Sequence, residues 1–113
     1  MTINSKQKGA RYERHVAGLF KSAGYDDAHR TQQFCGYHGT ADVEGVPGIH
    51  IECKHQERMQ LYDWVGQAKR DARDGEIPVV IHKKNNCEDL VTMTFEDWVQ
   101  MYREWECSVN GNT

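Results

Sequence analysis

The 113-residue sequence has no long hydrophobic run and no closely paired cysteines. Its apolar stretches fall well short of the roughly 20 residues that a transmembrane helix needs. The first residues, MTINSKQKGARYER, are polar and basic and lack the apolar segment of a secretory signal. The four cysteines form no CxxC pair, which is typical of reduced thiols rather than of a disulfide scaffold. We therefore expect a cytoplasmic protein that makes no membrane contact.

A surplus of positive charge is also missing, because the formal net charge is −3. This balance argues against a protein that coats nucleic acid by bulk electrostatics. The charge is unevenly distributed, however: residues 1–25 carry five lysines and arginines against one glutamate, whereas residues 85–113 carry six acidic residues against one arginine. A basic beginning and an acidic end indicate one surface for a polyanion and another for solvent or a partner. Two solvated helix faces would give the same pattern.

The length and composition fit a single domain over residues 1–113, with a disordered tail from about residue 108. Apolar residues at helical spacing predict helices over about 6–23 and 59–74 and a last helix that opens at Thr94. Segments punctuated by glycine predict a strand meander between the first two helices, and β-branched runs predict two strands between the last two. The order αβββαββα indicates an α/β fold, a central mixed β-sheet flanked by helices.

Two of the predicted helices have apolar faces that we assign to the core. In the second helix the residues expected to point inward are Leu61, Val65, Ala68 and Ala72. In the last helix one face carries Phe95, Trp98, Met101, Tyr102 and Trp105. Such an aromatic stripe is more often core than a platform for stacking bases, and a second subunit is the alternative cover for Met101 and Trp105.

A tight turn over residues 43–48 (VEGVPG) joins a predicted strand near Asp42 to one through Glu52. Side chains alternate along a strand, so Glu52 and Lys54 share a face. Magnesium prefers carboxylate oxygens, and a metal held by Asp42 and Glu52 can polarise a phosphodiester and activate a water. Lys54 can orient that water. Glu13, at the edge of the first helix's apolar stripe, is the candidate third carboxylate.

The D-x9-E-x-K spacing is weak by itself. An exposed strand with a Glu–Lys ion pair of little energetic value gives the same pattern. Zinc is a further reading of Cys35, His38, Cys53 and His55. Cys53 and His55, however, share the strand face opposite Glu52, and the spacing does not match a closed structural site, so we assign Cys53 to the core.

The surrounding segments make the pattern far more specific. Asp42 and Glu52-Cys53-Lys54 follow a helix that carries Lys8-Gly9-Ala10-Arg11-Tyr12-Glu13-Arg14. Together with the segments 39–43, 48–54, 67–72 and 78–82, they make the chain resemble the PD-(D/E)XK nuclease superfamily, and within it the archaeal Holliday-junction resolvases and similar small phage nucleases. The resemblance extends from about Lys6 to Trp105. It implies a restriction-endonuclease-like core.

The resemblance also implies roles for individual residues. The catalytic set would be Glu13, Asp42, Glu52 and Lys54, with the three carboxylates holding Mg²⁺ or, in its place, Mn²⁺. The residues expected to contact DNA are Lys8, Arg11, Arg14, Arg30, Gln33, Thr40 and Gln67. Gln67 is equally well read as a surface amide. Two departures from the family pattern are Ala41, where a proline often precedes the aspartate, and the missing loop serine, for which Thr40 is the nearest hydroxyl.

These features predict a metal-dependent endonuclease that hydrolyses phosphodiester bonds of branched DNA such as Holliday junctions, without a small-molecule cofactor. One site in a single domain makes a twofold homodimer the economical way to place two cuts. Two alternatives stay open: a flap or general DNA nuclease with the same chemistry, and a DNA-binding module without turnover.

Overall fold

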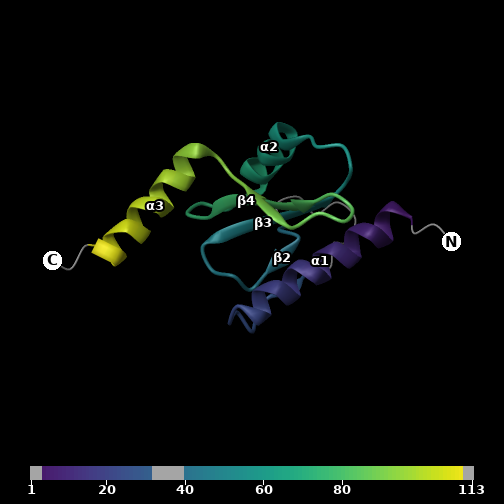
Figure 1. Cartoon of the computed structure of the whole chain (residues 1–113), viewed down its shortest axis with the longest axis horizontal. Coiled ribbons are helices and arrows are strands. Elements are labelled where there is room, and N and C mark those ends of the chain that lie inside the picture. Colours follow the sequence, from purple (N-terminus) through teal and green to yellow (C-terminus); the bar gives the residue numbers. More distant parts are fainter. Residues whose placement is uncertain (1–3, 32–39, 111–113) are drawn as a thin grey trace.

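A computed structural model describes residues 4–31 and 40–110 and shows one mixed sheet between helices (Figure 1). Along the chain the elements are α1 (Ser5–Ser22), β1 (His29–Arg30), β2 (Val43–Glu44), β3 (Ile49–His55), α2 (Leu61–Asp71), β4 (Ile77–Lys83), β5 (Leu90–Thr92) and α3 (Phe95–Asn110). This arrangement confirms the α/β class and the order αβββαββα, as expected for a restriction-endonuclease-like core.

The five strands lie side by side in the order β1-β2-β3-β4-β5. Only the central pair β3 and β4 is parallel, with Glu52 opposite Val80, and α2 forms the crossover between these two strands. The pairs on either side are antiparallel. In the predicted hairpin, Val43 of β2 pairs with Ile51 of β3, which brings the chain at Asp42 beside β3.

The two helices nearest the sheet cover its opposite faces. Tyr12, Val16 and Ala17 of α1 pack against alternate residues of the central strands, in a cluster that also contains Val43, Ile51, Cys53, Val79 and Ile81. Trp64 and Ala68 of α2 pack on Val80 from the other side. Because β3 side chains alternate, Cys53 points into the α1 layer, which agrees with its assignment to the core, and Glu52 points toward the α2 layer.

The second helix is shorter than predicted, and its inward face is different. It spans Leu61–Asp71 rather than about 59–74, and Ala72 already has an extended backbone with ψ of 142°. Trp64 and Ala68 are its buried residues, while Leu61 and Val65 are partly buried beside them. Leu61, Val65 and Ala68 thus face the core as predicted, Trp64 joins them there, and Ala72 lies beyond the helix.

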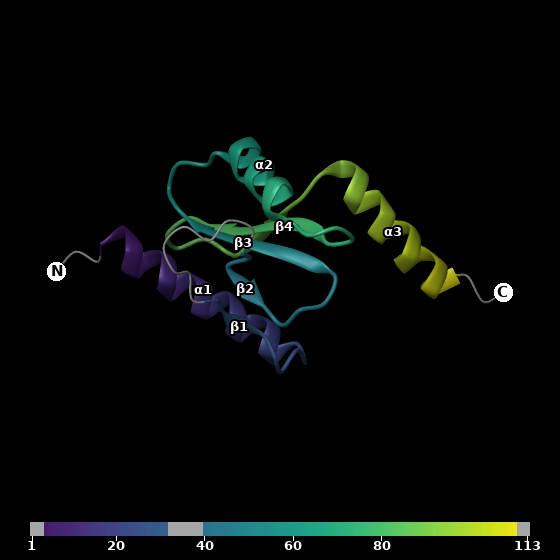
Figure 2. The same ribbon diagram turned by 180° about the vertical axis from the view of Figure 1, so that it is seen from behind.

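The prediction that the aromatic face of the last helix is core is wrong. No residue of α3 is buried, and Figures 1 and 2 show the helix projecting from the body. The two faces of the central strands are already covered by α1 and α2. The helix also continues to Asn110, whereas we expected a disordered tail from about residue 108; no glycine or proline interrupts it before Gly111. No helix within the described residues has the length and apolarity to cross a membrane.

The turn between β2 and β3 contains a glycine at a position where a side chain would collide with the neighbouring chain. Gly45 has φ of 91°, and a β-carbon there would collide with the backbone carbonyl of Asp27. Gly48 has a similar φ of 88°, but open space surrounds the position of its missing β-carbon. A side chain would strain the backbone at both positions, but it would collide with another part of the chain only at Gly45.

We expect Gly45→Ala to destabilise the protein by more than the roughly 1–2 kcal/mol that a left-handed backbone costs a residue with a β-carbon. Gly48→Ala should lose only that backbone contribution. Urea unfolding of both variants measures the difference. Equal losses would show that the contact with Asp27 does not constrain the hairpin.

Candidate active site

A cleft of about 750 Å³ opens between the N-terminal half of α1, the C-terminal half of β3 and the C-terminal half of α2. Its lining is almost entirely polar or charged, and Cys53 is the least polar side chain in it. The lining residues are Ser5, Lys8, Gly9, Glu13, Thr40, Asp42, Glu52, Cys53, Lys54, His55, Gln56, Glu57, Arg58, Gln67 and Asp71. The cleft thus brings together all four predicted catalytic residues, Glu13, Asp42, Glu52 and Lys54.

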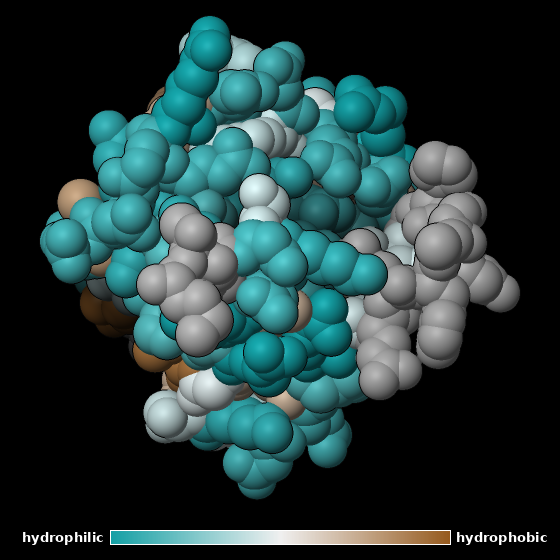
Figure 3. All heavy atoms as spheres, turned by 90° about the vertical axis from the view of Figure 1, so that its right-hand side faces the viewer, coloured by the Kyte–Doolittle hydropathy of each residue, from teal (hydrophilic) through white to brown (hydrophobic). Residues whose placement is uncertain are grey.

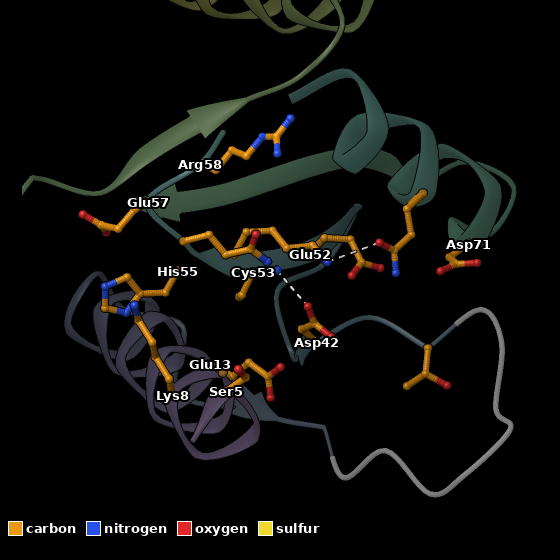
Figure 4. Close-up of a pocket in the computed structure, with 15 residues that line it drawn as sticks. Ser5, Lys8, Glu13, Asp42, Glu52, Cys53, His55, Glu57, Arg58 and Asp71 are labelled. Carbon is orange, nitrogen blue, oxygen red and sulfur yellow. Dashed lines mark hydrogen bonds between the residues drawn. The ribbon is translucent and has the colours of Figure 1, made fainter. Parts of the chain in front are cut away.

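Asp42 and Glu52 are the most deeply placed carboxylates of the cleft. Their residues are 7% and 2% exposed. Asp42 directly precedes β2, and its backbone N–H donates to Ile51 O at 2.8 Å, which fixes the aspartate beside β3. Its Oδ2 accepts a hydrogen bond of 2.8 Å from the backbone N–H of Cys53. Figure 4 shows the carboxylates of Asp42 and Glu52 in the same part of the cleft, with Glu13 below them.

Burial and neighbouring negative charge both work against the ionised form of Asp42. They raise its pKa to about 7: burial contributes most, and the charge of Glu52 comes next. Glu13 and a hydrogen bond with Glu52 act in the same direction, and the N–H of Cys53 opposes them. The protein therefore concentrates carboxylates in the cleft, and a proton or a bound cation would offset their charge.

Lys54 lies on the same strand face as Glu52, as the alternation of β3 predicted. Its Nζ donates to Oε1 of Gln67 at 3.3 Å. Gln67 comes from α2 and lines the cleft, so between the two sequence interpretations the structure favours the cleft residue over the surface amide. The amide holds the ammonium group at the wall of the cleft, beside the acidic pair.

Glu13 reaches the cleft from α1 and is paired with Arg30. The Nε of Arg30 donates to Oε1 of Glu13 at 2.7 Å, and both side chains are partly buried. Burial raises the pKa of Glu13, and the hydrogen bond and charge of Arg30 lower it in part. The predicted phosphate contact Arg30 is thus engaged with an acidic residue of the site and does not line the cleft.

The other predicted DNA contacts are placed differently. Lys8 and Thr40 line the cleft, whereas Arg11 and Arg14 are exposed on α1 outside its lining. Gln33 lies outside the described residues, as do Cys35 and His38 of the zinc reading.

His50 is a candidate positioning residue to which the sequence analysis gave no role. It is 1% exposed, and its Nε2 hydrogen-bonds Glu52 Oε1 at 2.8 Å. Its Nδ1 lies 3.9 Å from Glu76 Oε1 on the other side. Burial lowers the pKa of His50, but the hydrogen bond and charge of Glu52, with the charges of Glu76 and Asp71, raise it overall. The available signal was its position two residues before Glu52, on the same strand face.

Comparison with known families agrees with this geometry. Residues 4–110 match the family described as "Phage putative PDDEXK endonuclease". The chain belongs to this PD-(D/E)XK family. A search of curated proteins finds no match to the sequence. The residues matched include β3 and both helices that build the cleft.

The donor set of this PD-(D/E)XK chain fits a divalent cation. Two buried carboxylates, Asp42 and Glu52, lie close enough that burial and then the charge of Glu52 raise the pKa of Asp42. Carboxylate oxygens are the ligands that hard divalent ions prefer. Within the described residues, one ligand atom each of His50, Glu52 and Asp71 also lies within 4.8 Å of the others. Asp42 and Glu52 would hold the ion, with Glu13 at its border.

The acidic crowding predicts that the metal-free protein is stabilised by Asp42→Asn. A raised folded-state pKa means that the folded chain binds the proton more tightly than the unfolded chain. The stability from this group is therefore complete below about pH 4 and is lost as the pH rises through about 7. The shift from 3.8 to about 7 sets an upper limit of about 4 kcal/mol on the gain at pH 8.

Thermal unfolding in a chelator, at pH 8 and near pH 4, measures this effect. The increase in melting temperature of Asp42→Asn over the wild type should be smaller near pH 4 than at pH 8. Asp63→Asn removes an equal charge from an exposed position of α2 and serves as the control. A D42N protein less stable than the wild type at pH 8 would contradict the proposed crowding.

Loss of the imidazole contact should loosen Glu52. We expect His50→Ala to weaken Mn²⁺ binding about 10- to 100-fold, the usual effect of losing a partner that orients a metal ligand. His50→Gln retains a hydrogen-bond donor and should recover part of the affinity. Calorimetric titration gives the affinities, and thermal unfolding checks that both variants fold. Unchanged affinity in folded His50→Ala would exclude the positioning role.

Proposed function

We propose that the protein is a Mg²⁺-dependent endodeoxyribonuclease that cuts branched DNA, with four-way junctions as the preferred substrate. The observation that carries the proposal is the convergence of Glu13, Asp42, Glu52 and Lys54 in one polar cleft. Membership of an endonuclease family supports phosphodiester hydrolysis. The preference for branched DNA is supported by the resemblance of the motifs to junction resolvases. Mn²⁺ is the expected substitute metal.

Each side chain of the catalytic set has a separate role in the proposed reaction. A bound divalent ion would polarise the phosphodiester and lower the pKa of a water. Asp42 and Glu52 fix the position of that charge, and the backbone N–H of Cys53 fixes the orientation of Asp42. Lys54, held by Gln67, directs an ammonium group toward the attacking water and the scissile phosphate. Glu13, oriented by Arg30, adds acceptor oxygens at the border of the site.

DNA would approach the cleft along the basic side of α1. Lys8 lies in the cleft lining and Arg11 and Arg14 are exposed farther along the helix, where they can contact successive phosphates. Figure 3 views the molecule from the end that carries the N-terminus of α1, and hydrophilic residues cover most of that face. Thr40 offers a hydroxyl at the opposite wall of the cleft. A polar surface of this kind suits the phosphate backbone better than exposed bases.

Resolution of a four-way junction requires two coordinated cuts. Residues 4–31 and 40–110 form one cleft with the catalytic set, so we propose a twofold homodimer that presents two such clefts to one junction. The proposed dimer bears on why a four-way junction would be the preferred substrate. The cleavage chemistry of each cleft does not depend on it.

Cleavage of a labelled DNA panel tests the proposed activity. With Mg²⁺, the protein should cut a synthetic four-way junction faster than a flap, a nicked duplex or a linear duplex of the same sequence, and a chelator should stop the reaction. Faster cutting of the flap or the linear duplex would replace the substrate assignment and leave the chemistry intact. Absence of cutting on every substrate, with DNA binding retained, would support a binding module.

Replacing Asp42 by Asn should reduce cleavage about 10²- to 10³-fold, a loss comparable to removing a key electrostatic group of a catalytic site. Binding of the junction in Ca²⁺, followed by fluorescence anisotropy, should change little. The control is Asp63→Asn, which removes a carboxylate outside the cleft and should cut like the wild type. Cleavage by D42N at the wild-type rate would dismiss the assigned site.

A further inference from the structure

The helix α3 has an apolar face that the described part of the chain does not cover. Phe95, Trp98, Tyr102 and Trp105 form an aromatic stack in which the last ring is tilted, with successive ring centroids 6.2, 5.3 and 5.7 Å apart. Phe95 is 79% exposed and Trp105 is 58% exposed, and Val109 extends the same face. Helices of this length are only marginally stable alone in water. A contiguous exposed apolar surface made of four aromatic rings and a valine marks an interaction site.

The charge of α3 excludes two kinds of partner. The helix carries Glu96, Asp97, Glu104 and Glu106 against the single cation Arg103. An acidic helix is repelled by the phosphates of DNA, so the aromatic stack is unsuited to bases. Helices that lie on membranes carry lysine and arginine on their polar faces, which α3 lacks. The remaining partner is a protein surface with apolar and cationic groups.

The same chain offers such a surface. A groove of about 530 Å³ separates α2 from the segment that joins β5 to α3. Its lining is mainly apolar with one ammonium group, and includes Leu61, Tyr62, Val65, Lys69, Met93 and Phe95. Tyr62 is 95% exposed, which is unusually high for an aromatic side chain. Lys69 is exposed in the groove and complements the acidic side of α3.

We propose that α3 of one chain packs into the α2–β5 groove of a second copy, and that the second copy returns the same contact. This contact would form the homodimer of the proposed function. The inference rests on the proposed function only for the role of the dimer, which is to present two clefts to one junction. Twofold symmetry makes the contact twice, so each helix has a groove and each groove has a helix.

The available area reaches the lower limit for a specific dimer. An aromatic side chain buries about 150–250 Å² when fully covered. Four rings at about half exposure therefore supply roughly 400 Å² on each helix, and the smaller groove that receives them adds to this area. Two symmetric contacts bury on the order of 1,000 Å² in total, which is about the minimum for a specific interface.

The oligomeric state of the full chain, without DNA and in a chelator, tests the inference. Light scattering after size exclusion, over a dilution series, should give a dimer for the wild type. Trp105→Glu on the helix and Tyr62→Glu in the groove should each weaken the dimer at least about tenfold. Both positions are exposed, so circular dichroism should show an unchanged fold. Gln100→Glu adds the same charge to the opposite face of α3 and should remain dimeric.

A mixture of the two damaged chains separates this arrangement from other dimers. In a heterodimer of Trp105→Glu with Tyr62→Glu, one intact helix meets one intact groove, so mixing should restore part of the dimer. A monomeric wild type, which includes α3 folding back on its own groove, would overturn the proposal. So would a Tyr62→Glu protein that dimerises like the wild type. Either result would leave junction cleavage and its loss in Asp42→Asn unaffected, which keeps the two proposals distinguishable.

Discussion

The repulsion between the buried carboxylates of Asp42 and Glu52 is the interaction on which the rest of the site depends. Folding removes both groups from water and places them side by side, and the rise in the pKa of Asp42 to about 7 reflects that cost. The hairpin between β2 and β3 and the parallel pairing of β3 with β4 hold them there. The fold therefore loses stability at this point, and in the proposed mechanism a bound cation would offset that loss.

The other charged groups described around that pair are themselves oriented by neighbouring side chains. Arg30 is engaged by Glu13, and Lys54 is engaged by the neutral amide of Gln67. His50 hydrogen-bonds Glu52 and is not among the residues that line the cleft. In the proposed mechanism a divalent ion would bind at the two carboxylates, and the phosphate would lie at the border of the site.

The sequence predicted the features that follow from local periodicity. Alternation along β3 placed Glu52 and Lys54 on one face, and the glycine-rich turn placed Asp42 beside them. Features that depend on packing between distant segments were not predictable. The Glu13–Arg30 pair and the contact of Lys54 with Gln67 require the tertiary fold, and the role of His50 requires its side-chain orientation. The stripe on α3 revealed an amphipathic helix, but periodicity does not tell whether the chain itself or a partner covers it.

Calorimetric titration of Mn²⁺ into the protein near pH 7, in two buffers of different ionisation enthalpy, tests the central claim most directly. Because the pKa of Asp42 is raised to about 7, the account predicts that binding releases protons from the site, and that neither the binding nor the release occurs in Asp42→Asn or Glu52→Gln. Binding without proton release, or equal binding by the wild type and both variants, would contradict it.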